Sequence, residues 1–141
     1  MKHPFTLLAL IALGALPLSG QSASAGSPEQ IVNHHMSAAG SGRVDELMSD
    51  YADDAVLISP DAVLKGKQAI RGLFQTLMTP GPAALAPIDV KKRVFEGDVG
   101  YVTWIQNAGK PDEQKGSDTF VIRNGKIVYQ TVMMVRTAAT K

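Results

Sequence analysis

The sequence predicts an α+β fold in which helices come first and an antiparallel sheet follows. Between residues 28 and 78, apolar residues recur at intervals of three and four, which is the pattern of one face of a helix. Between residues 88 and 136, they form four runs of strand length. Asn124-Gly125, between the last two runs, is the strongest hairpin signal in the chain. Helices followed by an antiparallel meander favour α+β over a doubly wound sheet.

The first 25 residues have the features of a signal peptide. They combine a basic start at Lys2, an apolar run from Phe5 to Leu18 and a small-residue cleavage site at Ala23-Ser24-Ala25. The run is too short to span a bilayer, which disfavours a retained membrane anchor. We therefore expect cleavage after Ala25, a periplasmic or secreted bacterial protein, and one domain over residues 26–141.

The charge and cysteine content exclude several classes of protein. Removing Lys2 with the signal lowers Lys plus Arg from 14 to 13, which equals the 13 Asp plus Glu, so the mature chain is neutral. Neutrality gives no electrostatic reason to expect a nucleic acid or an anionic membrane surface as a partner. The chain has no cysteine, so the fold depends on its core rather than on disulfides.

The elements can be assigned in order along the chain. Ser27 is the expected N-cap of the first helix, with Pro28 at its first position. Gly40-Ser41-Gly42 ends that helix, Asp53-Asp54 ends the second, and Gly66 precedes the third. The expected helices cover residues 28–39, 43–51 and 67–78. The expected strands cover residues 55–59, 63–64, 88–96, 99–107, 117–123 and 126–136, with a rigid connection over residues 80–87.

Two stretches of the chain carry a resemblance to known proteins. The first runs from Tyr51 to Pro60 and continues from Lys65 to Ile70; the second is the hairpin from Ser117 to Ile127. Both are similar to the corresponding parts of SnoaL-like proteins and ketosteroid isomerases of the nuclear transport factor 2-like superfamily. With the helix order, the resemblance covers nearly all of the chain after residue 25. It implies a strongly curved sheet wrapped around three helices, a cone with an internal pocket. The superfamily includes isomerases, cyclases, dehydratases and non-catalytic modules, so the resemblance specifies the fold and not the reaction.

Asp118 is the first candidate catalytic residue. Strand alternation groups it with Gly116, Phe120 and Ile122, and a carboxyl on such a face must be protonated, paired or hydrogen-bonded. The resemblance implies that it matches the neutral aspartic acid with which ketosteroid isomerases stabilise an oxyanion. The alternative is a strand-end aspartate that faces solvent or pairs with Lys115.

His35 is the second candidate. It lies on the apolar stripe of the first helix, whereas His34 lies on the polar side. The resemblance implies that His35 replaces the tyrosine that donates to the same oxyanion, and a histidine there can donate a hydrogen bond or act as an acid or base. The alternative is a core histidine satisfied by a carbonyl or by Asp118. Because adjacent helical histidines point in different directions, they cannot both bind one metal ion, and we expect no metal site. We also expect that acid–base chemistry by these residues needs no cofactor.

The sequence departs from the isomerases at their general base. Those enzymes carry an aspartate before the proline that follows the first strand, and here Ser59 precedes Pro60. Serine cannot remove a proton from carbon without an activating base. Asp61 is more typical of a solvated turn residue. Steroid isomerisation by the known scheme is therefore not expected.

Alternation and the resemblance together predict which side chains face the pocket and which face outward. The side chains expected to line the pocket are Leu57, Ser59, Leu73, Phe74, Leu77, Tyr101, Thr103, Ile105, Phe120, Gln130, Val132 and Met134. Those expected on the outer face are Val102, Trp104, Val121, Tyr129, Thr131 and Met133. Such an apolar outer face predicts a homodimer with Trp104 as a buried anchor. Alternatively, Trp104 packs under residues 80–87 of its own subunit.

The sequence thus leads to two hypotheses of different classes. In the first, the protein is an exported enzyme that performs proton transfer on a small, apolar, oxygenated compound, as an isomerase, dehydratase or lyase. His35 and Asp118 would act on an oxygen of the substrate, and Tyr101 would position it. In the second, the protein is a non-catalytic ligand-binding or assembly module with the same fold.

Overall fold

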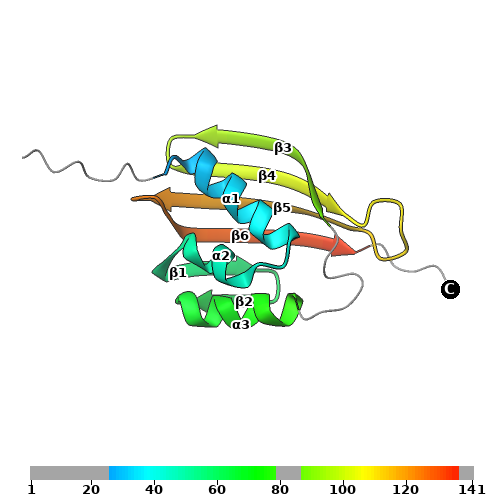
Figure 1. Cartoon of the computed structure of the whole chain (residues 1–141), viewed down its shortest axis with the longest axis horizontal. Helices are drawn as coiled ribbons and strands as arrows, with labels where there is room; N and C mark the ends of the chain where they lie inside the picture. Colours follow the sequence, from blue (N-terminus) through cyan, green and yellow to red (C-terminus); the bar gives the residue numbers. More distant parts are fainter. Residues whose placement is uncertain (1–25, 79–86, 137–141) are drawn as a thin grey trace, which may run out of the picture.

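The computed structural model describes residues 26–78 and 87–136. The expected signal peptide and residues 80–86 of the connection lie outside the described residues. The described chain forms three helices on one face of a curved, unclosed sheet (Figure 1). This arrangement confirms the expected α+β class.

The three helices lie close to their expected positions. Helix α1 spans Pro28–Gly40, α2 spans Val44–Ser49 and α3 spans Lys67–Leu77. Ser27 caps α1 with a capping box, since its hydroxyl accepts from the Gln30 amide and the Gln30 side chain accepts from the Ser27 amide. The cap satisfies amide groups that the first turn leaves without helical partners.

The described strands form one sheet of order β2-β1-β6-β5-β4-β3. The strands are β1 (Tyr51–Ser59), β2 (Ala62–Lys65), β3 (Ile88–Glu96), β4 (Val99–Gln106), β5 (Gln114–Arg123) and β6 (Lys126–Arg136). Strands β1 and β6 pair in parallel, and the other described neighbours pair antiparallel. Asn124 and Gly125 both have positive φ and form the expected tight turn.

The expectation that the second helix extends to Tyr51 is wrong. Helix α2 ends at Ser49, and Tyr51 begins β1 opposite Ile127 of β6. The amide of Ile127 donates to the Asp50 carbonyl at 2.8 Å, so the last strand fixes the end of the helix. Asp53 and Asp54 are exposed, as expected, but lie within β1. The apolar spacing that placed Tyr51 on a helix reflects its burial, which the strand provides instead.

The expected orientation of β4 is also wrong. Val102 pairs with Asp118, and Trp104 pairs with Gly116, so both side chains lie on the inner face beneath the helices. Tyr101, Thr103 and Ile105 therefore lie on the outer face. Both faces of β4 carry apolar residues, so the alternation predicts a strand but does not say which of its faces is buried.

Two glycines indicate which face is the inner one. A Cβ at Gly100 would meet side-chain carbons of Val32 and Phe95 at 3.0 Å, and one at Gly116 would overlap the Trp104 ring. A side chain at Gly116 has no room, and one at Gly100 would press against Val32 and Phe95, so these positions face the packed interior.

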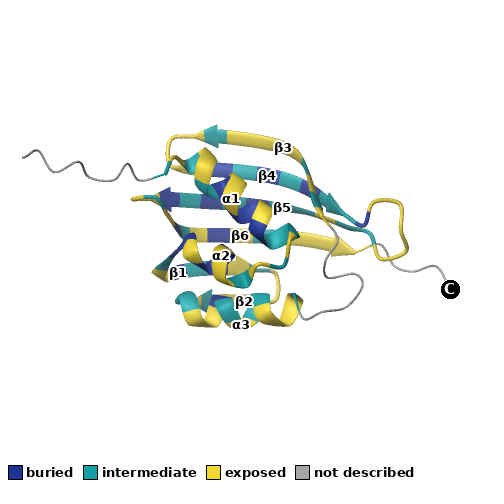
Figure 2. Cartoon of the chain, viewed as in Figure 1, coloured by how far each residue is buried: buried dark blue, intermediate teal, exposed yellow. Residues whose placement is uncertain are grey.

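The core lies between the inner face of the sheet and the helices. Buried positions concentrate on β4, β5 and β6 where the helices cover them, whereas the edge strand β3 is exposed along much of its length (Figure 2). Val32 of α1, Leu47 of α2 and Phe120 of β5 are completely buried in this core. The candidate site is embedded in the same layer.

Candidate functional site

Asp118 lies inside the molecule and accepts a hydrogen bond at each carboxyl oxygen. Its side chain is on the inner face of β5, and the residue is 4% exposed. The Trp104 indole N–H donates to Oδ2 at 2.6 Å, and the Gln130 amide donates to Oδ1 at 2.8 Å. These donors come from the two strands that flank β5, so the sheet register itself assembles the site.

Tyr51 extends this network towards the helices. Its hydroxyl donates to Oε1 of Gln130, whose amide nitrogen is already bound to Asp118. The four side chains thus form one buried chain from Trp104 through Asp118 and Gln130 to Tyr51. Burial, with nearby Asp118 and Asp50, raises the pKa of Tyr51 well above its usual value, so the hydroxyl keeps its proton.

Burial dominates the acidity of Asp118. Removal of the carboxyl from water raises its pKa from 3.8 to about 6, although the hydrogen bonds from Gln130 and Trp104 act in the opposite direction. An acid with this pKa changes its protonation state close to neutral pH, which is the property that general acid–base catalysis requires.

His35 lies next to this chain but does not bond to Asp118. Its ring is 2% exposed and makes edge contacts with Phe120 and Tyr51, at centroid distances of 5.2 and 5.3 Å. Its Nδ1 has no hydrogen-bond partner among the described residues. Burial, with nearby His34, lowers its pKa from 6.5 to about 3, so the ring is neutral at ordinary pH.

A second polar pair borders the site at the end of α2. The buried Asp50 carboxylate is bound by Nδ1 of His34 at 2.8 and 2.9 Å, and Nδ1 of His35 lies 3.8 Å from Oδ2. Burial raises the pKa of Asp50, and the His34 hydrogen bond opposes that shift. Asp50 thus binds His34, which is partly exposed, and lies near the buried His35 without a hydrogen bond to it.

The remaining candidate residues fall into two groups. Phe120 and Gln130 surround the cluster with Phe74, whose ring centroid is 6.1 Å from that of His35, and Leu73 packs against the same core. Tyr101 and Thr103 lie on the opposite face of the sheet, so their expected inward placement is wrong. Ser59 and Met134 lie away from the cluster: the Ser59 hydroxyl accepts from the Ala62 amide, and Met134 is 37% exposed near the end of β6.

Tyr51, Trp104, Asp50 and Gly116 belong to the site, and the sequence did not assign them to it. Tyr51 was placed on a helix and Trp104 on the wrong face. Gly116 carried a usable signal, since a glycine inside an apolar strand indicates a close approach of another group.

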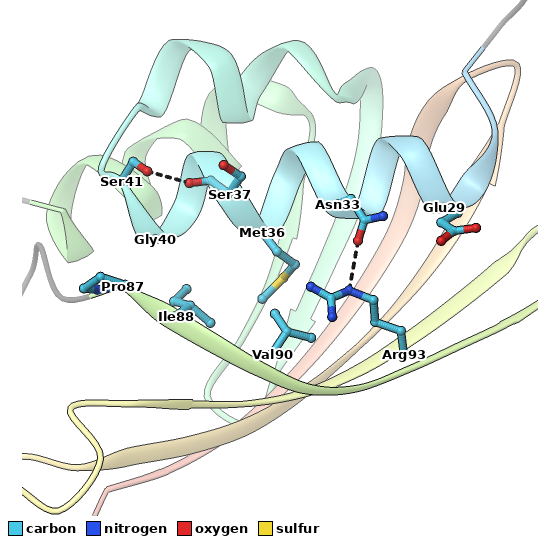
Figure 3. A pocket seen from close by; sticks show the side chains of 10 residues that line it. All are labelled: Glu29, Asn33, Met36, Ser37, Gly40, Ser41, Pro87, Ile88, Val90 and Arg93. Atoms are coloured by element: carbon cyan, nitrogen blue, oxygen red, sulfur yellow. Dashed lines mark hydrogen bonds between the residues drawn. The ribbon is translucent and has the colours of Figure 1, made fainter.

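Two hollows in the described part of the chain do not reach the cluster. One of about 670 Å³ lies between α1 and β3 (Figure 3), and one of about 300 Å³ lies by Ser59 and Thr131. His35 and Asp118 line neither. Residues 26–78 and 87–136 contain no group of three or more His, Asp or Glu side chains that could hold a metal ion. None of the described helices combines the length and the apolar character of a membrane span.

A helix-covered, curved and unclosed sheet with this strand order defines the nuclear transport factor 2-like class of α+β proteins. Within that class, the family model of the SnoaL-like domain matches residues 32–130, and the chain belongs to this family. No curated protein matches the chain.

Solved structures with the same fold are similar across most of the chain. A nuclear transport factor 2-like protein of unknown function from Burkholderia xenovorans is 21% identical with a TM-score of 0.64, covering 81% of this chain and 85% of its own. A candidate polyketide cyclase from Sinorhizobium meliloti is 23% identical with a TM-score of 0.64, covering 74% and 94%. Another, from Streptomyces antibioticus, is 20% identical with a TM-score of 0.64, covering 77% and 92%. At these identities the likeness establishes the fold.

Proposed function

We propose that this protein is a cofactor-independent enzyme that transfers a proton on a small, apolar, oxygenated organic compound, in a cyclase, isomerase, dehydratase or lyase reaction. The observation that carries the proposal is the buried Asp118 carboxyl, which has a pKa of about 6. His35, whose Nδ1 has no hydrogen-bond partner among the described residues, packs against Phe120 on the same face of β5. A buried polar atom without a partner destabilises a fold by about 1–3 kcal/mol, and groups with strongly shifted pKa values concentrate at functional sites.

The cluster supplies the groups that enolisation needs. Near pH 6, Asp118 is present in both forms, so it can deliver a proton to a carbonyl oxygen or remove one from the adjacent carbon. Neutral His35 has one ring nitrogen that can donate and one that can accept. The fold shared with two candidate polyketide cyclases supports this class of chemistry by analogy.

One observation favours a second candidate, a non-catalytic ligand-binding or assembly module. Asp118 and His35 are 4% and 2% exposed and line neither hollow, so a substrate reaches them only if the packing of the helices loosens. If that packing never opens, the buried network only fixes the core.

A test that needs no knowledge of the natural substrate is hydrogen–deuterium exchange at the acidic CH₂ of 2-tetralone, an apolar ketone, followed by proton NMR. An enolising enzyme accelerates this exchange, and Asp118→Asn should reduce the acceleration at least about 100-fold because general acid–base groups contribute on that scale. Asp54→Asn, which changes an exposed carboxylate of β1, is the matched control and should leave the exchange unchanged. Exchange no faster than in buffer, or equal in Asp118→Asn, would favour the module.

We also propose that two copies pair through the outer face of the sheet. The larger apolar residues of this face are Val56, Ile58, Val63, Val94, Val99, Tyr101, Ile105, Val121, Tyr129, Met133 and Val135, and no described helix covers them. One register row crosses the sheet from Glu96 through apolar side chains to Lys65. A twofold axis parallel to the strands would place Glu96 opposite the partner's Lys65, so the row is complementary to itself. This dimer does not involve Trp104, whose indole is inside.

Export is the last part of the proposal. Its support is the sequence of residues 1–25, and its test is intact mass spectrometry of the protein from a periplasmic fraction. A mass that begins at Gly26 is expected, and a full-length mass would contradict export with cleavage.

A further inference from the structure

The hollow between α1 and β3 has the dimensions of a small-molecule site. Its volume of about 670 Å³ lies within the range of ligand pockets, about 300–1,000 Å³. Helix α1 forms one wall and the inner face of β3 forms the other (Figure 3). It is separate from the cluster around Asp118, and ligand binding there does not depend on the chemistry proposed for that cluster.

The middle of this groove is apolar. Met36 of α1, which is 6% exposed, and Ile88 and Val90 of β3 direct their side chains into it (Figure 3). At one end, α1 approaches β3 so closely that a Cβ at Gly40 would lie 3.0 Å from the Ile88 nitrogen. The apolar part is therefore a slot between α1 and β3 that is closed at this end, and such a slot suits a flat hydrocarbon body.

The opposite end carries an exposed guanidinium group that is hydrogen-bonded to α1. Arg93 pairs with Val102, which places it on the inner face of β3, and its Nε donates to Oδ1 of Asn33 at 2.9 Å. Its other two nitrogens point towards Met36 and Val90 (Figure 3). Arg93 forms no ion pair with a carboxylate of the described residues. Glu29, which lines the same end, has an exposed side chain and is not within ion-pair distance of Arg93.

We propose that the groove binds a small carboxylic acid with a flat apolar body. The carboxylate would bind the two open nitrogens of Arg93, and the body would lie on Met36, Ile88 and Val90. A planar guanidinium matches a carboxylate with two parallel hydrogen bonds, and Asn33 holds it in the required orientation. The negative charge of Glu29 disfavours a ligand with further acidic groups at this end, so the groove fits a monoacid.

The experiment compares 1-naphthoate with 1-naphthalenemethanol, which carries the same ring with a neutral head group, by isothermal titration. The protein should bind the acid at least about tenfold more tightly, because a hydrogen bond to a charged partner contributes on that scale. Arg93→Gln should remove the preference. Lys92→Gln removes the same charge one position away, on the outer face of β3, and should keep it.

A second measurement locates the bound acid and guards against a variant that fails to fold. In the unaltered protein, naphthoate should shift the NMR signal of the Met36 methyl group and leave that of Met133, on the outer face, in place. Absence of saturable naphthoate binding, equal affinity for acid and alcohol, an unchanged preference in a folded Arg93→Gln variant, or a shift at Met133 instead of Met36 would each overturn the proposal.

Discussion

Asp118 is subject to two opposing influences, and the balance between them defines its chemistry. Burial disfavours the carboxylate, whereas donors from Trp104 and Gln130 favour it, and the resulting pKa is about 6. His35, whose ring packs against Phe120 in the same core, is buried as a neutral base with a pKa of about 3. Each group is thus held in its uncharged form over a range of pH in which the unfolded chain would carry the charge.

These two shifts have opposite effects on stability. The raised pKa of Asp118 gives a stabilising contribution that is complete below about pH 4 and is lost as the pH rises through 6. The lowered pKa of His35 gives one that is complete above pH 6.5 and is lost as the pH falls towards 3. Between pH 4 and 6 the folded and unfolded states therefore bind equal numbers of protons at these two sites, and their effects offset each other.

In Asp118→Asn, the effect of His35 on stability should no longer be offset by that of Asp118. The free energy of unfolding of the variant should fall on acidification between pH 6 and 4, relative to the wild type, by about 1.4 kcal/mol per pH unit. Urea denaturation at several pH values measures the difference. Asp54→Asn is the control, and its curve should run parallel to that of the wild type. Parallel curves for Asp118→Asn would show that Asp118 titrates normally.

At the scale of the elements, the site depends on which face of β4 lies inside and on one glycine of β5. The register pairs Trp104 with Gly116, and a side chain at 116 would occupy the space of the indole, with a Cβ 2.6 Å from Trp104 Cε2 and 2.8 Å from the Met133 carbonyl oxygen. Gly116 therefore allows Trp104 to lie flat on the sheet and reach Asp118.

Gly116→Ala should destabilise the protein and release the tryptophan. Overpacking of this kind costs about 1–3 kcal/mol, to which the lost hydrogen bond to Asp118 adds. Thermal unfolding measures the loss, and a red shift of tryptophan fluorescence reports the displaced ring, since Trp104 is the chain's one tryptophan. Gly72→Ala is the control, because a Cβ there meets nothing within 4 Å. An unchanged melting temperature and spectrum for Gly116→Ala would contradict the packing of Trp104 against Gly116.

The elements also show what the sequence could and could not predict. The three helices, apart from the end of the second, the succession of strands along the chain and the final turn follow from local signals: the Ser27 cap, the three-and-four spacing and Asn124-Gly125. The face of β5 follows because Asp118 alternates with the apolar residues Phe120 and Ile122. The face of β4 does not, because Val102 and Trp104 are as apolar as Tyr101 and Ile105. Contacts between distant residues, such as Tyr51 with Gln130, depend on the tertiary fold and left no local pattern.

At the scale of the whole molecule, the helices cover one face of the sheet and leave the other available for a second copy (Figure 1). Tyr129, Met133 and Val135 of β6 are 48%, 56% and 63% exposed on that outer face. So many large apolar side chains on one surface are typical of an interface between subunits.

Met133→Asp should convert the proposed dimer into a monomer. A carboxylate buried without a partner in an interface costs several kcal/mol, so the dissociation constant should rise at least about 100-fold. Light scattering coupled to size-exclusion chromatography measures the mass. Met134→Asp is a matched control, since Met134 is the next residue, also exposed, and points to the inner face. A monomeric wild type, or equal effects of both variants, would contradict pairing through the outer face.

The central claim is that Asp118 is an interior acid that exchanges its proton near neutral pH while bound to Trp104. A fluorescence titration of Trp104 tests it most directly, because the indole N–H donates to the titrating carboxyl and there is no second tryptophan to contribute. The wild type should show a transition with a midpoint near pH 6 that persists in His34→Gln and disappears in Asp118→Asn. A midpoint near pH 4, or a transition that survives in Asp118→Asn, would contradict it.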